Sequence, residues 1–405
     1  MVVESLTVEG HLLDEHKLSQ VLATLDEHGV PFHVRRFRIG DRAEDESLID
    51  LELHGETAEQ IQAAVQACAQ FGVKFSFEDA ELAEADRDGV LPEGFYSTTN
   101  FQTNVRVQGE TIGVERLEMD CGIRVWREEG GWRAETCPMH KARKGDLFVV
   151  GFKGLRVVPP VREEAERDEF RFMIQDVSTE RPKGRLIEAC AACIKRAKRR
   201  GERVLFVGGP AIVHSGCASV LERMIWDGWI DVLFAGNALA AHDIEAAMLG
   251  TSLGVDLSQG RSVPHGHTHH LRAINRVRRA GGISAAVEQS LIESGIMHAC
   301  VKKPIPFVLC GSIRDDGPLP EVFTDVMEGQ DAMRREVPGV GVALLCATTL
   351  HSVATGNILP ASVVTFCVDS DADSVIKLLD RGTHQAIGIA TDVEYFLKDL
   401  AARLG

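Results

Sequence analysis

The chain has 405 residues, a formal net charge of −16 at pH 7, 44% hydrophobic residues and 26% charged residues. Its length allows two or three domains, and its acidic balance argues against nucleic acid or an anionic membrane as the main partner. No run of about 18 apolar residues occurs and the N-terminus is acidic, so we expect neither a membrane helix nor a signal peptide. Ten cysteines, most of them in apolar runs, predict buried free thiols in a cytoplasmic protein.

Residues 1–80 alternate between strand and helix patterns. Alternating apolar segments at 2–12, 30–39 and 47–55 predict strands, and a short strand follows at 73–77. Between them, apolar residues at helical spacing predict two helices, the second opened by Thr57. The order βαββαβ predicts a ferredoxin-like α+β domain. Such a unit serves either as scaffold, which we favour, or as a regulatory or oligomerisation module.

Residues 81–175 differ in composition from the segments on either side. Short β-prone runs are separated by Asp, Glu, Gly and Thr, which predicts a small β-rich domain with tight turns. The acidic run at 162–170 predicts a solvated linker or a surface helix. We therefore place domain boundaries near residues 80 and 175.

From residue 176 to 405 the pattern predicts a Rossmann-like α/β domain with a parallel sheet. An amphipathic helix carrying Cys190 and Cys193 leads into the first of several nearly continuous apolar runs, which are typical of strands covered on both faces. Core packing explains these two cysteines better than zinc does. The predicted strands are 203–209, 229–236, 304–312, 340–349, 361–369 and 385–392.

Small or polar residues follow each of these six predicted strands. In an open parallel sheet the ligand crevice lies outside the carboxyl ends of the strands, where glycines and helix N-termini approach phosphate. Asp369 and Asp392 are placed to accept hydrogen bonds from ribose hydroxyls, but both also suit helix N-caps. The G-x-G-x-x-G fingerprint is missing after the first strand, which reads FVGGPAIVHSG. We therefore predict nucleotide binding by a non-standard Rossmann variant.

The segment PHGHTHHL places four histidines close together. Imidazole is the commonest zinc ligand, but neither HExxH nor a paired CxxC accompanies this segment. Cys137 and His140 likewise lack a second pair of ligands. We therefore predict no metal site, and we interpret the segment as a substrate-facing loop in which one histidine is an acid/base.

Several long segments resemble one known family. FVGGPAIVHSG, LFAGNALAAHDIE, GTSLGVDLSQGRSVPHGHTHHLRAINRV, CGSIRDDGPLPEV and TTLHSVATGN are similar to the archaeal-type ornithine cyclodeaminases, a family carrying a LOR/SDH label. The same module forms the C-terminal part of an arginine dihydrolase/ornithine cyclodeaminase fusion. The dihydrolase part has no counterpart here, so arginine is not an expected substrate.

The resemblance implies NAD bound on a Rossmann-like domain akin to deoxyhypusine synthase. It also implies conversion of L-ornithine to L-proline and ammonia with a recycled hydride. The cofactor contacts that it implies are Asn237, Ala238, Asp316, Thr349, Leu350, His351, Asp369, Asp392 and Val393.

The implied reaction needs a cation for the α-carboxylate, an anion for the δ-ammonium and a base for the amines. We assign Asp256 as the anion or base and His265 or His267 as the acid/base. Lys302 or Lys303 is assigned to the carboxylate, although an exposed pair flanking a strand explains these lysines equally well. We also expect the enzyme to be a homo-oligomer.

Two other classes of function fit the strand-end pattern. One is an NAD-dependent amino-acid dehydrogenase or reductase with net hydride transfer. The other is a non-catalytic nucleotide sensor, which the histidine-rich loop disfavours because that loop serves no evident purpose in a sensor.

Overall fold

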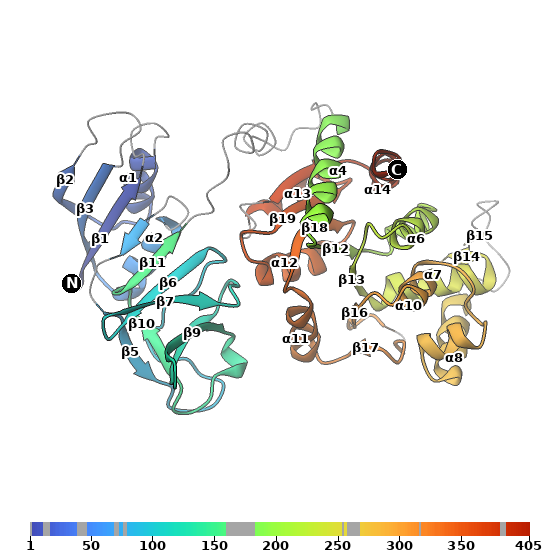
Figure 1. The fold of residues 1–405 in the computed structure, drawn as a ribbon, viewed down its shortest axis with the longest axis horizontal. Coiled ribbons are helices and arrows are strands. Elements are labelled where there is room, and N and C mark those ends of the chain that lie inside the picture. Colours follow the sequence, from blue (N-terminus) through green and yellow to red (C-terminus); the bar gives the residue numbers. More distant parts are fainter. Residues whose placement is uncertain are drawn as a thin grey trace. The chain divides into compact units, whose positions relative to one another are not determined.

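The computed structural model describes residues 2–10, 17–38, 47–68, 73–75, 79–158, 183–252, 255–256, 268–315, 317–380 and 386–405. The chain forms two compact units, shown in Figure 1. Unit 1 comprises residues 1–162 and 357–361, and unit 2 comprises residues 163–356 and 362–405. None of the described helices combines the length and the apolar character needed to cross a membrane.

The N-terminal part of unit 1 has the predicted βαββαβ order. Its elements are β1 (Val2–Gly10), α1 (Lys17–Glu27), β2 (Phe32–Arg38), β3 (Ser47–Gly55), α2 (Ala58–Cys68) and β4 (Val73–Phe75). The strands pair antiparallel in the order β2-β3-β1-β4, which is the ferredoxin-like arrangement. Every second residue of β3 is buried, so one face of this sheet packs against α1 and α2.

The β-rich part of unit 1 continues the same sheet. Its strands are β5 (Glu81–Glu84), β6 (Gln102–Val107), β7 (Glu110–Glu115), β8 (Gly122–Glu128), β9 (Gly131–Cys137), β10 (Leu147–Val150) and β11 (Leu155–Val158). Pairing of β4 with β11 joins them to the first four strands, giving an 11-stranded sheet. The boundary near residue 80 stays a prediction, because hydrogen-bonded strands lie on both sides of it.

A short segment from far along the chain completes unit 1. The N–H of Ala361 donates to the carbonyl of Asn100 at 2.8 Å, and the Asn100 amide donates to the carbonyl of Leu359 at 3.2 Å. The N–H of Met119 donates to the carbonyl of Asn357 at 2.9 Å. Ala361 is part of the hydrophobic core of unit 1. Unit 1 is therefore discontinuous in sequence.

Unit 2 contains a seven-stranded parallel sheet in the order β17-β16-β13-β12-β18-β19-β20. Its strands are β12 (Arg203–Gly208), β13 (Val232–Gly236), β16 (Phe307–Cys310), β17 (Val322–Phe323), β18 (Val340–Cys346), β19 (Val364–Asp369) and β20 (Ala386–Ala390). This confirms the six predicted strands and adds the two-residue β17. A separate hairpin pairs β14 (Thr251–Ser252) with β15 (Val255–Asp256).

The helices of unit 2 connect these strands. They are α4 (Lys183–Arg199), α5 (Ala211–His214), α6 (Ala218–Trp226), α7 (Asn237–Leu249), α8 (His269–Ala280), α9 (Ile283–Glu288), α10 (Ile296–Lys302), α11 (Val326–Glu336), α12 (Thr349–Ile358), α13 (Ala372–Asp380) and α14 (Val393–Leu404). The last two residues of α12 already belong to unit 1.

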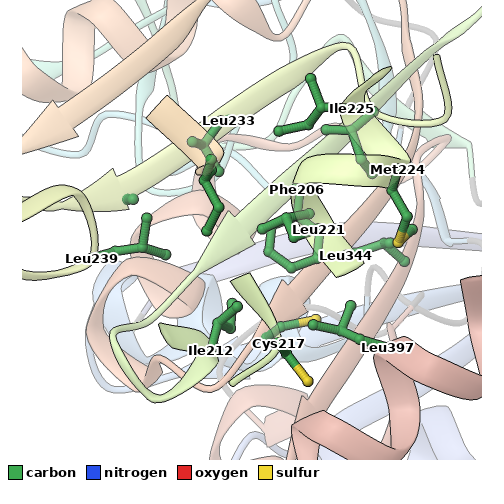
Figure 2. Packing of buried hydrophobic residues seen from close by; sticks show 14 of the residues in the cluster. Phe206, Ile212, Cys217, Leu221, Met224, Ile225, Leu233, Leu239, Leu344 and Leu397 are labelled. Carbon is green, nitrogen blue, oxygen red and sulfur yellow. The ribbon is translucent and has the colours of Figure 1, made fainter. Parts of the chain in front are cut away.

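The core of unit 2 is built from the apolar strand residues and the helix faces packed on them. Figure 2 shows part of it, in which Phe206, Leu221 and Leu344 lie close together. Cys190 and Cys193 belong to this core, which confirms their interpretation as packing residues. All ten cysteines are free thiols, and all except the half-buried Cys310 are buried.

The strand order of unit 2 indicates where a ligand crevice is expected. From β12 the chain moves outward through β13 and β16, and it then returns to β18 on the other side of β12. The direction of winding therefore reverses between β12 and β18. In open α/β sheets ligands bind outside the carboxyl ends of the strands at such a reversal.

Candidate functional site

Two loops meet at the carboxyl ends of β12 and β18. Gly209 follows β12, and its N–H donates to the carbonyl of Cys346 at 3.0 Å. A Cβ atom on Gly209 would lie only 1.8 Å from the carbonyl oxygen of Ala347, so only glycine fits here. Two backbone segments therefore approach each other closely at the strand ends, and the side chain of Thr348 lies beside them.

The first turn of α12 reaches over the end of β13. A Cβ atom on Gly236 would lie 3.0 Å from Cε1 of His351. Burial lowers the pKa of His351, and the charge of Asp315 partly opposes this shift, so the imidazole is neutral at pH 7. The neighbouring Thr349 is exposed, and Leu350 is 74% exposed. These predicted cofactor residues therefore lie at the crevice, with one large apolar side chain open to a ligand.

Asn237, the first residue of α7, holds a neighbouring loop. Its side chain is 4% exposed, and its Oδ1 accepts the N–H of Leu319 at 3.0 Å. Ala238 follows in the same turn and is half-buried. Asp316, another predicted contact, lies outside the described residues. Asn237 thus fixes the connection between β16 and β17 at the carboxyl edge of the sheet.

The two strand-end aspartates differ in their hydrogen bonds. Asp392 caps α14 by accepting the N–H groups of Glu394 at 2.7 Å and Tyr395 at 3.3 Å. Asp369 accepts the N–H of Asp371 at 3.0 Å. The first turn of α13 is capped by Asp371 instead. The capping alternative therefore describes Asp392, next to the buried Val393, whereas Asp369 closes only a local turn.

A buried polar cluster lies on α5, α7, β14 and the start of α8. At its centre is Glu245 of α7, whose exposed fraction is 0%. Nδ1 of His242 lies 3.0 Å from one Glu245 carboxylate oxygen, and the Thr251 hydroxyl donates to the other at 2.9 Å. Nδ1 of His269 lies 2.8 Å from the Thr251 hydroxyl. We call Glu245, His242, Thr251 and His269 the Glu245 network.

Two further histidines surround this network. The ring centroid of His214 lies 4.8 Å from that of His242, and Nδ1 of His214 lies 2.7 Å from the Ser252 hydroxyl. Burial and the neighbouring His242 lower the pKa of His214. His270 lies on the other side, with its ring centroid 6.0 Å from that of His242. The cluster thus combines neutral imidazole with a buried carboxylate, which suits proton transfer.

The side chains of three predicted catalytic residues lie outside the described part of the chain. Asp256 lies in β15, where its backbone pairs with Thr251 of the Glu245 network, but its side chain is outside the described residues. His265 and His267 also lie outside them. In the part of the chain that the structure describes, no three His, Cys, Asp or Glu side chains are arranged to hold a metal ion.

Lys302 lies away from the strand ends. It is exposed, and it ends α10, shortly before β16 begins. It therefore lies toward the amino edge of the sheet, and Lys303 beside it donates to the carbonyl of Trp226. This position gives the predicted carboxylate role no support.

The Glu245 network includes residues that sequence reasoning did not single out. His242 and Glu245 lie within the quoted segment LFAGNALAAHDIE, and His214 lies within FVGGPAIVHSG. The available signal was polar residues inside an otherwise apolar helical run. Their convergence depends on tertiary structure, because α7, β14 and α8 each supply only one or two members and the neighbouring His214 comes from α5.

Comparison with known proteins identifies the chain over its whole length. Residues 188–400 match a family described as arginine dihydrolase ArgZ-like, C-terminal, Rossmann fold. Residues 102–187 match the first region of the same C-terminal part, and residues 3–101 match a LOR/SDH bifunctional enzyme conserved region.

Individual relatives agree with these matches. An ornithine cyclodeaminase of Methanopyrus kandleri is 46% identical over 402 residues, covering 99% of this chain and 97% of that protein. The crystal structure of a LOR/SDH protein from Methanococcus maripaludis superposes with a TM-score of 0.75 at 46% identity, covering 81% of this chain and 98% of that one. A ternary complex of AgrE, a bifunctional enzyme of Nostoc, with ornithine and NAD+ matches with a TM-score of 0.53 at 35% identity, covering 100% of this chain and 58% of that one. The chain belongs to the ornithine cyclodeaminase family.

Proposed function

We propose that this chain is an NAD-dependent ornithine cyclodeaminase, which converts L-ornithine to L-proline and ammonia. The observation that carries the proposal is the ternary complex of AgrE with ornithine and NAD+, because 58% of AgrE matches the whole of this chain. The Rossmann fold of unit 2 supplies the cofactor crevice.

The crevice fits a dinucleotide. Gly209 and Ala347 bring two backbone segments close together at the strand ends, where we place the pyrophosphate, and Leu350 offers an exposed apolar surface. Bound NAD+ would supply a hydride acceptor for Cα of ornithine and would return the same hydride when the ring has closed. We propose that it is held by Asn237, Ala238, Asp316, Thr349, Leu350, His351, Asp369, Asp392 and Val393.

The protein must bind the substrate and move its protons. Ornithine brings one carboxylate and two ammonium groups, and an amine is nucleophilic only after it has lost a proton. We retain Asp256 as the proposed anion or base and His265 or His267 as the proposed acid/base. Lys302 remains a candidate for the carboxylate, although its exposed position on α10 does not favour it.

The test is incubation of the purified protein with L-ornithine and NAD+. We expect proline and ammonia in equal amounts, with no net change in NADH absorbance, because the hydride is returned. NADH that accumulates in proportion to substrate consumed would favour the amino-acid dehydrogenase instead. NAD binding without any turnover of ornithine would favour the nucleotide sensor.

We also propose that the protein works as a homo-oligomer in the cytoplasm. Light scattering of the purified protein tests the first statement, and a single-chain mass would contradict it. Fractionation of the source cells tests the second.

A further inference from the structure

The Glu245 network has one acceptor at its centre. Glu245 is fully buried, and each of its carboxylate oxygens faces one member of the network, His242 at 3.0 Å and the Thr251 hydroxyl at 2.9 Å. Burying a carboxylate is costly unless hydrogen bonds compensate for the lost water. Glu245 is buried beside a group of histidines, on a helix that begins with Asn237 at the carboxyl end of β13.

This arrangement determines which ring nitrogens carry protons. An ionised carboxylate only accepts hydrogen bonds, so with Glu245 ionised Nδ1 of His242 donates to it, and Nε2 is the ring nitrogen left to accept a proton. The Thr251 hydroxyl has one proton and donates it to Glu245. Nδ1 of His269 must therefore donate to the Thr251 oxygen. One buried carboxylate thus holds two imidazoles with Nε2 as the basic atom.

We propose that His242 is a catalytic acid/base of the cyclodeamination and that Glu245 is its positioning residue. This inference rests on the proposed function. Once the δ-ammonium of ornithine has lost one proton to water, its nitrogen adds to the oxidised Cα, and Nε2 of His242 takes a second proton from this nitrogen. Nε2 then gives that proton to the α-nitrogen, whose bond to Cα breaks as the lone pair of the ring nitrogen forms the new C=N bond, and ammonia leaves. The proton taken from the ring nitrogen is passed to the leaving nitrogen, so this exchange needs no external acid.

The groups around His242 suit this role. On α5, burial lowers the pKa of His214, which keeps a second positive charge away from a protonated His242. On α8, His270 lies beside His242, and His269 is linked to it through Thr251 and Glu245. Asp243, next in sequence, accepts N–H groups of α10 instead.

The first test uses His242→Gln and Glu245→Gln, assayed with saturating NAD+. We expect kcat to fall roughly 10²–10⁴-fold in both, while the KM for ornithine and the NAD affinity stay within about threefold. Glu321→Gln and His298→Gln are matched controls: a half-buried glutamate that caps α9 through the N–H of Ile283, and a half-buried histidine near Trp226. Both controls should keep the kcat of the unmodified enzyme.

The second test reads the ring tautomers directly, by nitrogen NMR of the histidine-labelled protein. We expect one Nδ1–H signal to disappear in His242→Gln and another in His269→Gln, and both of these signals to change in Glu245→Gln. If the unmodified protein makes proline and Glu245→Gln is equally active, or if His242 is the Nε2–H tautomer, this inference is wrong while the proposed function stands. Unmodified protein that makes no proline from ornithine would contradict the proposed function, and this inference with it.

Discussion

The crevice at the strand ends and the Glu245 network lie in the same unit but are built differently. The crevice is made of backbone, with Gly209 against Ala347 and with helices that begin at Asn237 and Thr349. The network is made of side chains from helices and a hairpin, and its central carboxylate is fully buried. Backbone at strand ends suits phosphate and ribose, whereas oriented imidazoles suit proton transfer. We therefore expect changes in the crevice to alter cofactor affinity and changes around the network to alter turnover.

The largest effect should come from the histidine-rich loop that precedes α8. His265→Ala or His267→Ala should lower turnover by roughly 10²–10⁴-fold and leave NAD affinity nearly unchanged. Steady-state kinetics and calorimetric NAD titration measure the two quantities. Stoichiometric zinc that is lost in either variant together with the folded state would show that the loop holds a metal instead.

Asp243 is a second buried acidic residue on α7, and it tests whether burial alone makes such a residue important for turnover. Burial raises its pKa to about 7, although the N–H groups of Met297 and Ile296 oppose the shift. The folded protein thus holds a proton that the unfolded chain releases near pH 4. This contribution to stability is complete below about pH 4 and is lost as pH rises through 7, by on the order of 4 kcal/mol.

The comparison variant is Asp243→Asn, which cannot titrate. We expect the unfolding free energy of the unmodified protein, relative to this variant, to decline between pH 4 and pH 7 in denaturant titrations. Parallel profiles would contradict the raised pKa. We expect Asp243 to affect stability and not turnover. A kcat per folded molecule below one tenth of normal in Asp243→Asn would contradict this difference between Asp243 and the Glu245 network.

Gly209→Ala should disturb the crevice through its backbone. The added Cβ would lie 1.8 Å from the Ala347 carbonyl oxygen, so the loop after β18 must move. We expect a loss of roughly 1–3 kcal/mol in stability together with weaker NAD binding, measured by thermal melting with and without NAD. Gly184→Ala at the start of α4 is the control, because its nearest neighbour would lie at 3.5 Å. Equal stability and equal NAD affinity of the two variants would contradict the proposed importance of the close contact between Gly209 and Ala347.

The smallest effect should be that of Asp369→Ala. If Asp369 accepts a ribose hydroxyl, its removal should weaken NAD binding by about 1–3 kcal/mol with little change in melting temperature. Asp371→Ala is the control, since Asp371 caps α13 and should affect melting but not NAD affinity. A lower melting temperature with unchanged NAD affinity in Asp369→Ala would show that Asp369 stabilises a turn and does not bind NAD.

The sequence predicted the parallel strands of unit 2 well and the Glu245 network hardly at all. Parallel strands leave a local pattern, an apolar run followed by small and polar residues, so β12, β18 and their neighbours were placed correctly. The network has no such pattern, because residues as distant as His242 and His269 meet only when α7, β14 and α8 pack. Histidine spacing drew attention to the segment at 264–271, whereas the buried Glu245 is recognisable only from its surroundings.

The segment that completes unit 1 has a consequence for protein synthesis. Asn100 and the core beside it contact Leu359 and Ala361 in the folded protein. The ribosome synthesises these two residues only after most of unit 2. Unit 1 therefore reaches its complete form only after residue 361 has been synthesised. A fragment ending at residue 162 would lack these hydrogen bonds and the Ala361 side chain of the core.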